Sequence, residues 1–335
     1  MPRALITGVT GMVGSHLTDY LLEATDWDIF GLARWRSPLD NILHLSPIIN
    51  SEQRLELIYG DLNDDDSLRS AIRKSKPDFV FHLAAQSFPL TSFSAPIQTL
   101  ETNVNGTFRL LNAVMEFAPE ARVHVCSSSE VFGRVPREYL PIKEDTPFHP
   151  ASPYAISKVG TDLIGKFFSE AYNLHVVITR MFTHTGPRRG DVFAESSFAK
   201  QIAMIEAGLI DQTIKVGNLQ SLRTFADVRD AVRAYYLCLS SPIPSGTIFN
   251  IGGTFTCTIG EMLNSLISMS SHATFKVLED PHRMRPIDAD LQIPDTSAFQ
   301  NLTGWKPEIS FEKTLSDLLN YWRDKISSLG SAIQR

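Results

Sequence analysis

Short apolar runs alternate with longer segments of helical periodicity through the first half of the chain. Six of these runs predict strands, at residues 4–6, 27–32, 55–59, 79–83, 123–126 and 176–178. They are continuously apolar, as strands buried on both faces are, and helical segments separate them. The pattern therefore predicts a doubly wound α/β unit with a parallel sheet, and a ligand crevice at the carboxyl ends of its strands.

The second half of the chain has a different pattern. From about residue 186 onward, many Pro and Gly residues mark short connections between irregular segments. We expect one unit over residues 1–185 and a smaller C-terminal lobe over residues 186–335, laid against the first. Some later segments, at about 217–250, are expected to return to the first unit.

Two helical segments have wide apolar faces that allow two interpretations. The residues concerned are Val104, Phe108, Leu111, Val114 and Phe117 in the first segment, and Leu163, Ile164, Phe167, Phe168 and Tyr172 in the second. Such faces either lie in the core or form a helix-pair interface between two copies of the chain. The second interpretation predicts a homodimer or homotetramer.

Composition excludes several classes of protein. The chain has 335 residues, of which 43% are apolar and 20% charged, as in an ordinary folded protein, and its net charge is 31 − 37 = −6. A basic field for nucleic acids or anionic membranes is therefore absent, and no apolar run reaches the ~20 residues of a membrane helix. We expect neither a nucleic-acid partner nor a membrane.

The cysteines Cys126, Cys238 and Cys257 are odd in number, far apart and without a C-x-x-C motif. This spacing indicates neither a disulfide framework nor a zinc site, and no other cluster has metal-ligand spacing, so no metal is expected. The N-terminus lacks the features of a signal peptide. These observations predict a cytoplasmic protein.

A glycine-rich motif follows the first predicted strand and opens a helix. Its glycines allow a pyrophosphate to approach the backbone at a helix N-terminus, although a Gly-rich tight turn is the alternative. The predicted dinucleotide-binding residues of this motif are Thr7, Gly8, Thr10, Gly11, Met12, Val13 and Gly14.

The end of the second predicted strand indicates which dinucleotide is bound. No acid stands there for the ribose 2′-hydroxyl of NAD; Arg34, Arg36 and Ser37 stand there instead. Guanidinium groups bind a 2′-phosphate, so NADP is favoured over NAD, with a solvated basic loop as the alternative. Asp61, after the third strand, is a candidate contact for the adenine amino group.

Candidate catalytic residues come from two further segments. Tyr154 and Lys158 are four residues apart on one helix face, where the ammonium can lower the pKa of the phenol and make it a usable base. Ser128 and Glu130 directly follow a predicted strand and would lie at the carboxyl edge of the sheet. A surface Tyr–Lys pair is the alternative interpretation.

Together these motifs resemble the extended short-chain dehydrogenase/reductase family, a Rossmann-like fold, over nearly the whole chain. Within its nucleotide-sugar branch, residues 83–88, 129–133 and 152–154 are similar to GDP-mannose 4,6-dehydratases. Residues 198–202, 216–219, 227–230 and 303–307 are at least as similar to GDP-4-keto-6-deoxy-mannose reductases. The resemblance implies a tightly bound, recycled NADP, or alternatively NAD, and a GDP-sugar substrate.

The resemblance also implies roles for the catalytic residues. Tyr154 would take the proton of the sugar carbon-4 hydroxyl, Lys158 would hold the nicotinamide ribose, and Ser128 would bind the carbon-4 oxygen. In a dehydratase, Glu130 would remove the carbon-5 proton so that water leaves carbon 6. A reductase, an epimerase, another nucleotide-sugar or carbonyl enzyme, and a dinucleotide sensor without turnover stay open as alternatives.

Further contacts follow from the resemblance, residue by residue. Arg223 and Arg285 would clamp the diphosphate of the nucleotide sugar, or else form ion pairs between the lobes. Further implied cofactor contacts are Leu62, Leu83, Ala84, Ala85, His184 and Arg189. Further implied substrate contacts are Gln86, Ser87, Asn103, Thr183, Lys200 and Asn218.

Overall fold

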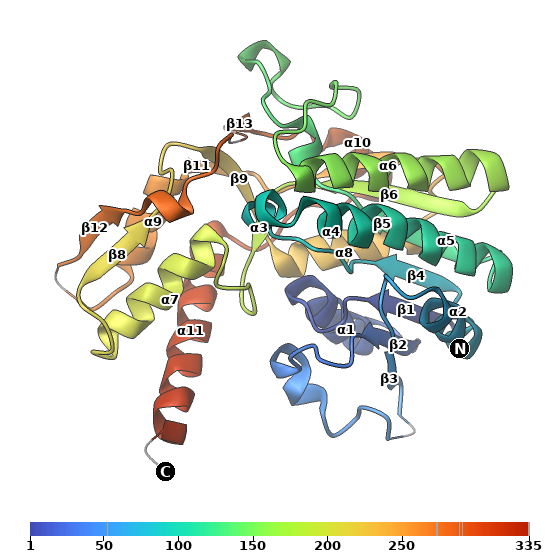
Figure 1. The fold of residues 1–335 in the computed structure, drawn as a ribbon, viewed down its shortest axis with the longest axis horizontal. Helices are drawn as coiled ribbons and strands as arrows, with labels where there is room; N and C mark the ends of the chain where they lie inside the picture. Colours follow the sequence, from blue (N-terminus) through green and yellow to red (C-terminus); the bar gives the residue numbers. More distant parts are fainter. Residues whose placement is uncertain (52, 273, 288, 290, 334–335) are drawn as a thin grey trace.

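A seven-stranded parallel sheet forms the centre of the larger lobe (Figure 1). The computed structural model describes residues 1–333 except 52, 273, 288 and 290. The strand order is β10-β6-β5-β4-β1-β2-β3, and the chain changes direction across the sheet between β1 and β4. The strands are β1 (Arg3–Thr7), β2 (Asp28–Ala33), β3 (Leu55–Tyr59), β4 (Phe79–His82), β5 (Arg122–Cys126), β6 (His175–Met181) and β10 (Ile248–Ile251). The predicted doubly wound sheet is confirmed.

Helices cover both faces of this sheet, as the buried strands require. The helices α1 (Met12–Ala24) and α8 (Val228–Ser240) pack together on one face. On the other face lie α2 (Asp65–Ser75), α5 (Gly106–Phe117) and α6 (Pro153–Tyr172). Two short helices, α3 (Pro89–Ser94) and α4 (Pro96–Leu100), and a π-helical turn (Glu101–Asn105) lead into α5.

The start of α6 is determined by its local sequence. The Ser152 hydroxyl accepts a hydrogen bond from the Ala155 amide at 3.0 Å, and Pro153 occupies the first helical position, where its missing N–H costs nothing. The helix ends at Asn173 in a left-handed conformation. This start places Tyr154 and Lys158 in the first two turns, next to the carboxyl end of β5.

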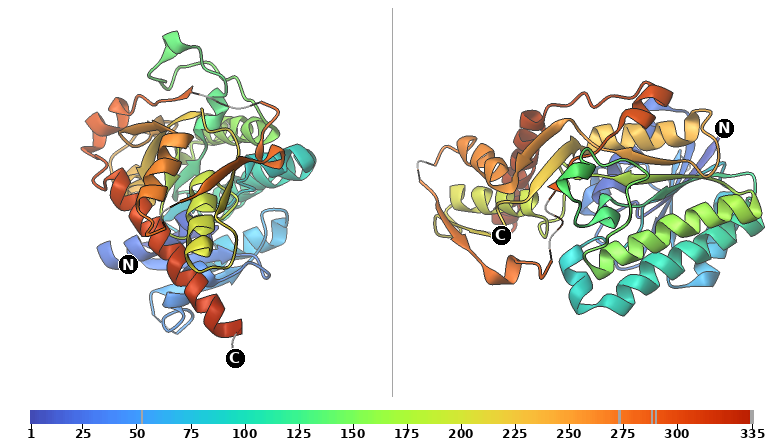
Figure 2. Two further views of the ribbon diagram at one scale, coloured as in Figure 1. Left: turned by 90° about the vertical axis from the view of Figure 1, so that its left-hand side faces the viewer. Right: turned by 90° about the horizontal axis from the view of Figure 1, so that it is seen from above.

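The smaller lobe lies beside the larger one in Figure 2. It has its own apolar core. Its strands are β7 (His184–Thr185), β8 (Thr213–Val216), β9 (Leu222–Asp227), β11 (Phe255–Thr258), β12 (Lys276–Glu279) and β13 (Leu291–Gln292). Its helices are α7 (Ala194–Glu206), α9 (Ile259–Ser268) and α11 (Phe311–Ile333). The chain returns to the large sheet through α8 and β10, and α10 (Ser297–Thr303) packs on β10.

The two apolar helix faces are divided between core and surface. Leu111, Val114 and Phe168 are fully buried. A row of other large apolar side chains on α5 and α6 remains 39–53% exposed, namely Phe108, Ile156, Leu163, Phe167 and Tyr172. The core interpretation is therefore confirmed for the buried residues, and the interface between two copies stays a prediction for the exposed row. In the described part of the chain, no helix is long and apolar enough to cross a membrane.

Buried histidines make the stability of this fold dependent on pH. His124 on β5 bonds to the Thr179 hydroxyl and lies against the Tyr235 ring, and burial lowers its pKa to about 3. Below pH 6.5 the unfolded chain binds a proton that the folded chain rejects. The contribution of each such histidine to the free energy of unfolding is therefore fully present above that pH. It is lost as the pH falls towards 3, by up to about 1.4 kcal/mol per pH unit.

Between pH 6.5 and 4.5, we expect His124→Gln to lower the slope of the unfolding free energy against pH by the contribution of about one proton, which is about 1.4 kcal/mol per pH unit. Urea unfolding at several pH values measures the slope of the unfolding free energy. His44→Gln is the matched control, because the His44 side chain is 45% exposed and contacts Asp19 at the surface. Equal slopes for wild type and His124→Gln would contradict the assignment.

Candidate active site

A cavity of about 1110 Å³ lies between the two lobes, at the carboxyl ends of the parallel strands. The glycine-rich loop lines one end of it, and Arg223 and Arg285 line the other. Single small-molecule sites commonly have volumes of about 300–1,000 Å³. The cavity is larger than this range and lies at the switch point of the sheet, where ligands of such folds bind.

The glycine-rich loop brings backbone amides to the cavity. Gly8 has a φ of +75°, and a Cβ there would lie 3.0 Å from the Ala84 nitrogen. A Cβ on Gly14 would lie 2.2 Å from the Gly8 carbonyl oxygen, so both positions require glycine. Among the described contacts no side chain caps the start of α1. Its first amides face the cavity and can bind a phosphate.

Charged and polar groups surround the outer end of this loop. Arg34 and Ser37 line the cavity, and the Asn41 side chain donates to the Thr10 carbonyl at 3.0 Å, which ties the segment after β2 to the glycine-rich loop. Asp61 also lines the cavity, beside β3. Arg36 is exposed and does not line it.

The predicted catalytic residues Ser128, Glu130, Tyr154 and Lys158 all line the cavity. Lys158 is 6% exposed, and its ammonium donates to the Cys126 carbonyl at 2.7 Å, at the end of β5. The Ser128 hydroxyl caps the next turn by accepting from the Glu130 amide at 3.2 Å. Helix α6 and the end of β5 therefore bring a phenol, an ammonium, a hydroxyl and a carboxylate to one wall.

The electrostatics of Tyr154 differ from the expectation that Lys158 lowers the pKa of the phenol. Burial raises the pKa of Tyr154 well above its ordinary value, and the Ser128 hydroxyl opposes this shift. Glu130 raises the pKa further, whereas Arg189 lowers it. Burial also lowers the pKa of Lys158. Desolvation outweighs the nearby positive charges in the protein alone.

Glu130 and Arg285 contact each other across the cleft. The Arg285 guanidinium donates to Glu130 Oε1 at 3.3 Å, and both side chains are partly buried. One of the two comes from the large lobe and the other from the small lobe. The predicted carbon-5 base and a predicted diphosphate clamp are thus ion-paired partners in this structure.

His184 presents an acceptor to the cavity. Its Nδ1 contacts the Phe182 carbonyl at 3.2 Å and must carry the proton, because a carbonyl only accepts. Burial lowers the pKa of His184 to about 4, so the ring is neutral. Its Nε2 is buried and has no hydrogen-bond partner in the part of the chain that the structure describes. An amide or hydroxyl donor of a bound molecule fits this atom.

The loop after β4 is held by side chains beneath the cavity. The Thr7 hydroxyl accepts from the Leu83 and Ala84 amides at 3.1 and 3.0 Å. The Asn103 side chain is buried; it accepts from the Gln86 amide at 2.8 Å and donates to the Gln86 carbonyl at 2.9 Å. Asn103 also bonds to Ser157 on α6 at 2.9 Å. These bonds join the loop to α6, which carries Tyr154 and Lys158.

The structure brings most of the predicted contacts to this cavity. Four predicted residues lie outside its lining: Thr7 and Asn103, which are buried beneath it, the exposed Arg36, and Lys200, which pairs with Asp191. Arg223 lines the cavity and also donates to the Ala289 carbonyl. The predicted set thus contains both lining residues and supporting residues.

Sequence reasoning missed several lining residues, among them Phe88, Phe193 and Arg283. Phe88 is the last residue of the segment 83–88 that was singled out, although it was not named as a contact, so its position in the chain was a usable signal. Phe193 and Arg283 lie in irregular segments where no motif points to the cavity. Among the described residues, no three His, Cys, Asp or Glu side chains gather as a metal site would require.

Comparisons with known proteins agree with this arrangement. A family model described as GDP-mannose 4,6 dehydratase matches residues 5–318. The chain is 33% identical to GDP-mannose 4,6 dehydratase 1 of Arabidopsis thaliana, over 95% of this chain and 88% of that protein. It is 30% identical to the GDP-6-deoxy-D-mannose reductase of Pseudomonas aeruginosa, over 97% and 98% of the two chains.

A solved structure has the same fold. The structure of RMD from Pseudomonas aeruginosa, complexed with NADPH, superimposes with a TM-score of 0.81 at 29% identity, covering 96% of this chain and 99% of that chain. The resemblance inferred from the motifs is therefore confirmed, and the relatives include both a dehydratase and a reductase.

The Asn103 hydrogen bonds predict a measurable contribution to stability. Asn103→Ala leaves the Gln86 amide and carbonyl without their partner, which lowers the free energy of unfolding by about 2–4 kcal/mol. Asn105→Ala, two residues along the same turn at an exposed position, should change it by less than about 0.5 kcal/mol. Urea unfolding checks both values, and similar results for the two variants would contradict the prediction.

Proposed function

Because the chain belongs to the GDP-mannose 4,6-dehydratase family, we propose that it converts GDP-mannose to GDP-4-keto-6-deoxy-mannose with a nicotinamide dinucleotide as its recycled cofactor. The observation that carries this proposal is the clustering of Ser128, Glu130, Tyr154 and Lys158 on one wall of a cavity that the glycine-rich loop also lines. A hydroxyl, a carboxylate, a phenol and an ammonium are the groups that this reaction needs.

The cofactor fits the half of the cavity lined by the glycine-rich loop. The amides at the start of α1 would bind its pyrophosphate, and Arg34 with Ser37 would bind the 2′-phosphate of NADP. Asp61 would bind the adenine, and the unpartnered Nε2 of His184 would accept from an amide or hydroxyl of the nicotinamide half. When bound, the cofactor accepts a hydride from the sugar and later returns it.

Tyr154 acts on the carbon-4 hydroxyl of the sugar. Its phenolate would take the hydroxyl proton while Ser128 donates to the carbon-4 oxygen. Burial opposes ionisation of Tyr154 in the protein alone, so the positive charge of bound ligands and of Lys158 would have to favour the phenolate. Lys158 would hold the ribose next to it, from its position on the Cys126 carbonyl.

Glu130 removes the carbon-5 proton once carbon 4 is a ketone. The ketone acidifies that proton; Glu130 takes it and returns it to the carbon-6 hydroxyl, which leaves as water as the carbon-5–carbon-6 double bond forms. Arg285 is ion-paired with Glu130 in the structure, so the two side chains must separate before Glu130 can act as a base. The diphosphate of the substrate is a competing partner for Arg285, together with Arg223 and Asn218 in the same half of the cavity.

We also propose a homodimer formed through the exposed row on α5 and α6. Four further large apolar side chains lie beside Phe108 on this row, and an apolar patch of this kind is costly to leave in water.

A cytoplasmic location fits the three free cysteines.

The central test uses the purified protein and GDP-mannose without added reductant. Mass spectrometry should show a product that has lost one water, with no net change in cofactor. Glu130→Gln should keep sugar binding but lower turnover by about 100-fold or more, because the base is gone. Glu138→Gln is the matched control, since Glu138 is exposed and does not line the cavity.

A reductase would give a different result in the same experiment. GDP-mannose would be unchanged, and the 4-keto-6-deoxy sugar would be reduced at the expense of added NADPH. Unchanged turnover in Glu130→Gln would remove the elimination role of Glu130 even if dehydration occurs.

The choice between NADP and NAD predicts a difference between two neighbouring arginines. Arg34→Ala should weaken NADPH binding by about 10- to 100-fold, because it removes charge-assisted hydrogen bonds to the 2′-phosphate, and should leave NADH binding unchanged. Arg36→Ala should change NADPH binding less than about threefold, since Arg36 does not line the cavity. Titration calorimetry measures the affinities of wild type and of both variants for NADPH and for NADH. Equal losses for NADPH and NADH in Arg34→Ala would refute the 2′-phosphate site.

A further inference from the structure

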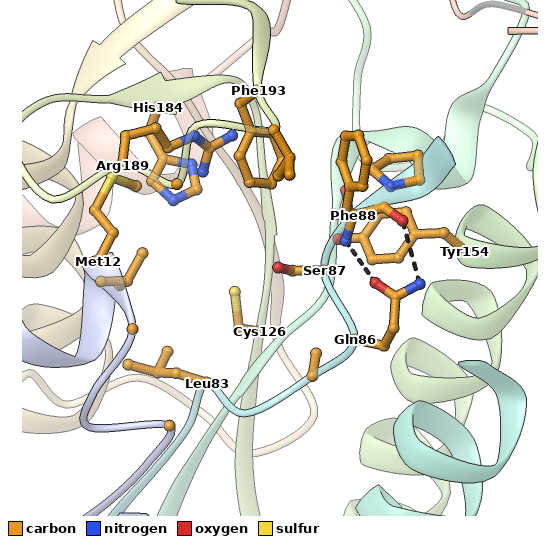
Figure 3. Close-up of a pocket in the computed structure, with 18 of the residues that line it drawn as sticks. Met12, Leu83, Gln86, Ser87, Phe88, Cys126, Tyr154, His184, Arg189 and Phe193 are labelled. Atoms are coloured by element: carbon orange, nitrogen blue, oxygen red, sulfur yellow. Dashed lines mark hydrogen bonds between the residues drawn. The ribbon is translucent and has the colours of Figure 1, made fainter. Parts of the chain in front are cut away.

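Two phenylalanine rings meet across the cleft between the lobes. Phe88 follows β4 in the large lobe, and Phe193 precedes α7 in the small lobe. Their ring centroids are 5.5 Å apart with an interplanar angle of 73°, an edge-to-face contact. In Figure 3 the two rings lie along one side of the cavity, whereas Leu83 and Cys126 lie along the other. The cavity runs between these two sides.

Phe88 is held by the side chain of Gln86. The Phe88 amide donates to the Gln86 side-chain oxygen at 2.6 Å, and the Gln86 side-chain nitrogen donates to the Phe88 carbonyl at 3.2 Å (Figure 3). The same nitrogen bonds to Thr99 at 3.1 Å. Because both polar atoms of the Gln86 amide are used in this way, Gln86 positions Phe88 in this structure.

Phe193 is held by a charged side chain on its own lobe. The Arg189 guanidinium lies over the Phe193 ring, 3.5 Å from its centroid, and contacts the buried Glu195 at 3.1 Å. The Phe193 carbonyl also accepts from the Ser197 amide at 2.7 Å, at the start of α7. Each ring is therefore rigidly held within its own lobe, and only the edge-to-face contact joins the two rings.

The position of this contact restricts access to the reactive wall. Arg189 and His184 lie on one side of the labelled group in Figure 3, Tyr154 lies on the other, and the two rings span the space between them. A molecule bound between Tyr154 and Arg189 would lie next to the two rings. An edge-to-face pair contributes only about 0.5–1.5 kcal/mol beyond its buried area, so such a contact can open and close readily.

We propose that Phe88 and Phe193 form an aromatic clasp that opens to admit ligands and closes over the Tyr154 end of the cavity. The clasp slows the exit of whatever is bound there and, during turnover, retains the unfinished sugar until hydrogen returns to carbon 6. The second part of this inference rests on the proposed dehydratase function. The first part does not, since it concerns only the escape of a bound ligand.

The escape of a ligand can be measured without turnover. NADPH bound to the protein is displaced by excess NADP in a stopped-flow instrument, and its fluorescence reports the dissociation rate. Phe88→Ala and Phe193→Ala should each raise this rate about 2- to 12-fold, which is the contact energy above expressed as a rate ratio. Because each variant removes the same contact, the double variant should be no faster than the faster single variant.

Three controls separate the clasp from a general loss of structure. Phe88→Leu and Phe193→Leu keep apolar volume and should raise the rate less than the alanine variants do. Phe255→Ala removes a stacked ring pair with Phe311 outside the cavity and should leave the rate unchanged. Thermal midpoints for all variants identify any that fail to fold. If an alanine variant fails, the dissociation rate of the leucine variant at the same position tests the clasp instead.

Turnover with GDP-mannose tests the second part of the proposal. The alanine variants should release a sugar that has lost water but carries two hydrogens fewer than the product, and wild type should release none. If wild type does not dehydrate GDP-mannose, the proposed function fails and the dissociation rates still decide the clasp. Unchanged dissociation rates in both alanine variants, or effects that multiply in the double variant, would overturn the clasp.

Discussion

The structure of the active cleft depends on the hydrogen bonds of one hydroxyl group, that of Thr7. It accepts from two amides of the loop after β4, so its own proton goes to His82 Nδ1 at 3.0 Å. His82 then donates from Nε2 to Thr107 at 2.9 Å, and Thr107 donates to the Asn103 carbonyl at 2.5 Å. Every proton in this chain is assigned, and burial lowers the pKa of His82 to about 3, which keeps its ring neutral.

This chain of bonds connects the glycine-rich loop to α6. β1 and β4 are neighbours at the switch point of the sheet, and their carboxyl ends diverge into two loops that form the floor of the cavity. Asn103 continues the network to Gln86 and to Ser157 on α6. The glycine-rich loop and the Tyr154 wall are thus positioned by one buried network of neutral groups, which costs less to bury than charges do.

The charged groups of the cleft are arranged differently, since they lie at contacts between the lobes. Arg285 of the small lobe meets Glu130 of the large lobe, and Arg189 supports the ring that meets Phe88. The neutral network lies within the large lobe, whereas the Arg285–Glu130 ion pair and the aromatic contact join the two lobes across the cavity. Separation of Arg285 from Glu130 and opening of the proposed clasp would both act on these cross-lobe contacts.

The sequence by itself determined the parallel sheet, the glycine-rich loop and the Tyr154–Lys158 pair, because these depend on local periodicity and on spacing within one strand or helix. Tertiary structure alone decided the direction of the Tyr154 pKa shift, since burial outweighs the Ser128 hydroxyl and the Arg189 guanidinium, which lower the pKa. It also decided the partners of Gln86, Glu130 and Phe193. Those partners lie in loops whose meeting depends on how two lobes pack, and no local pattern records such a contact.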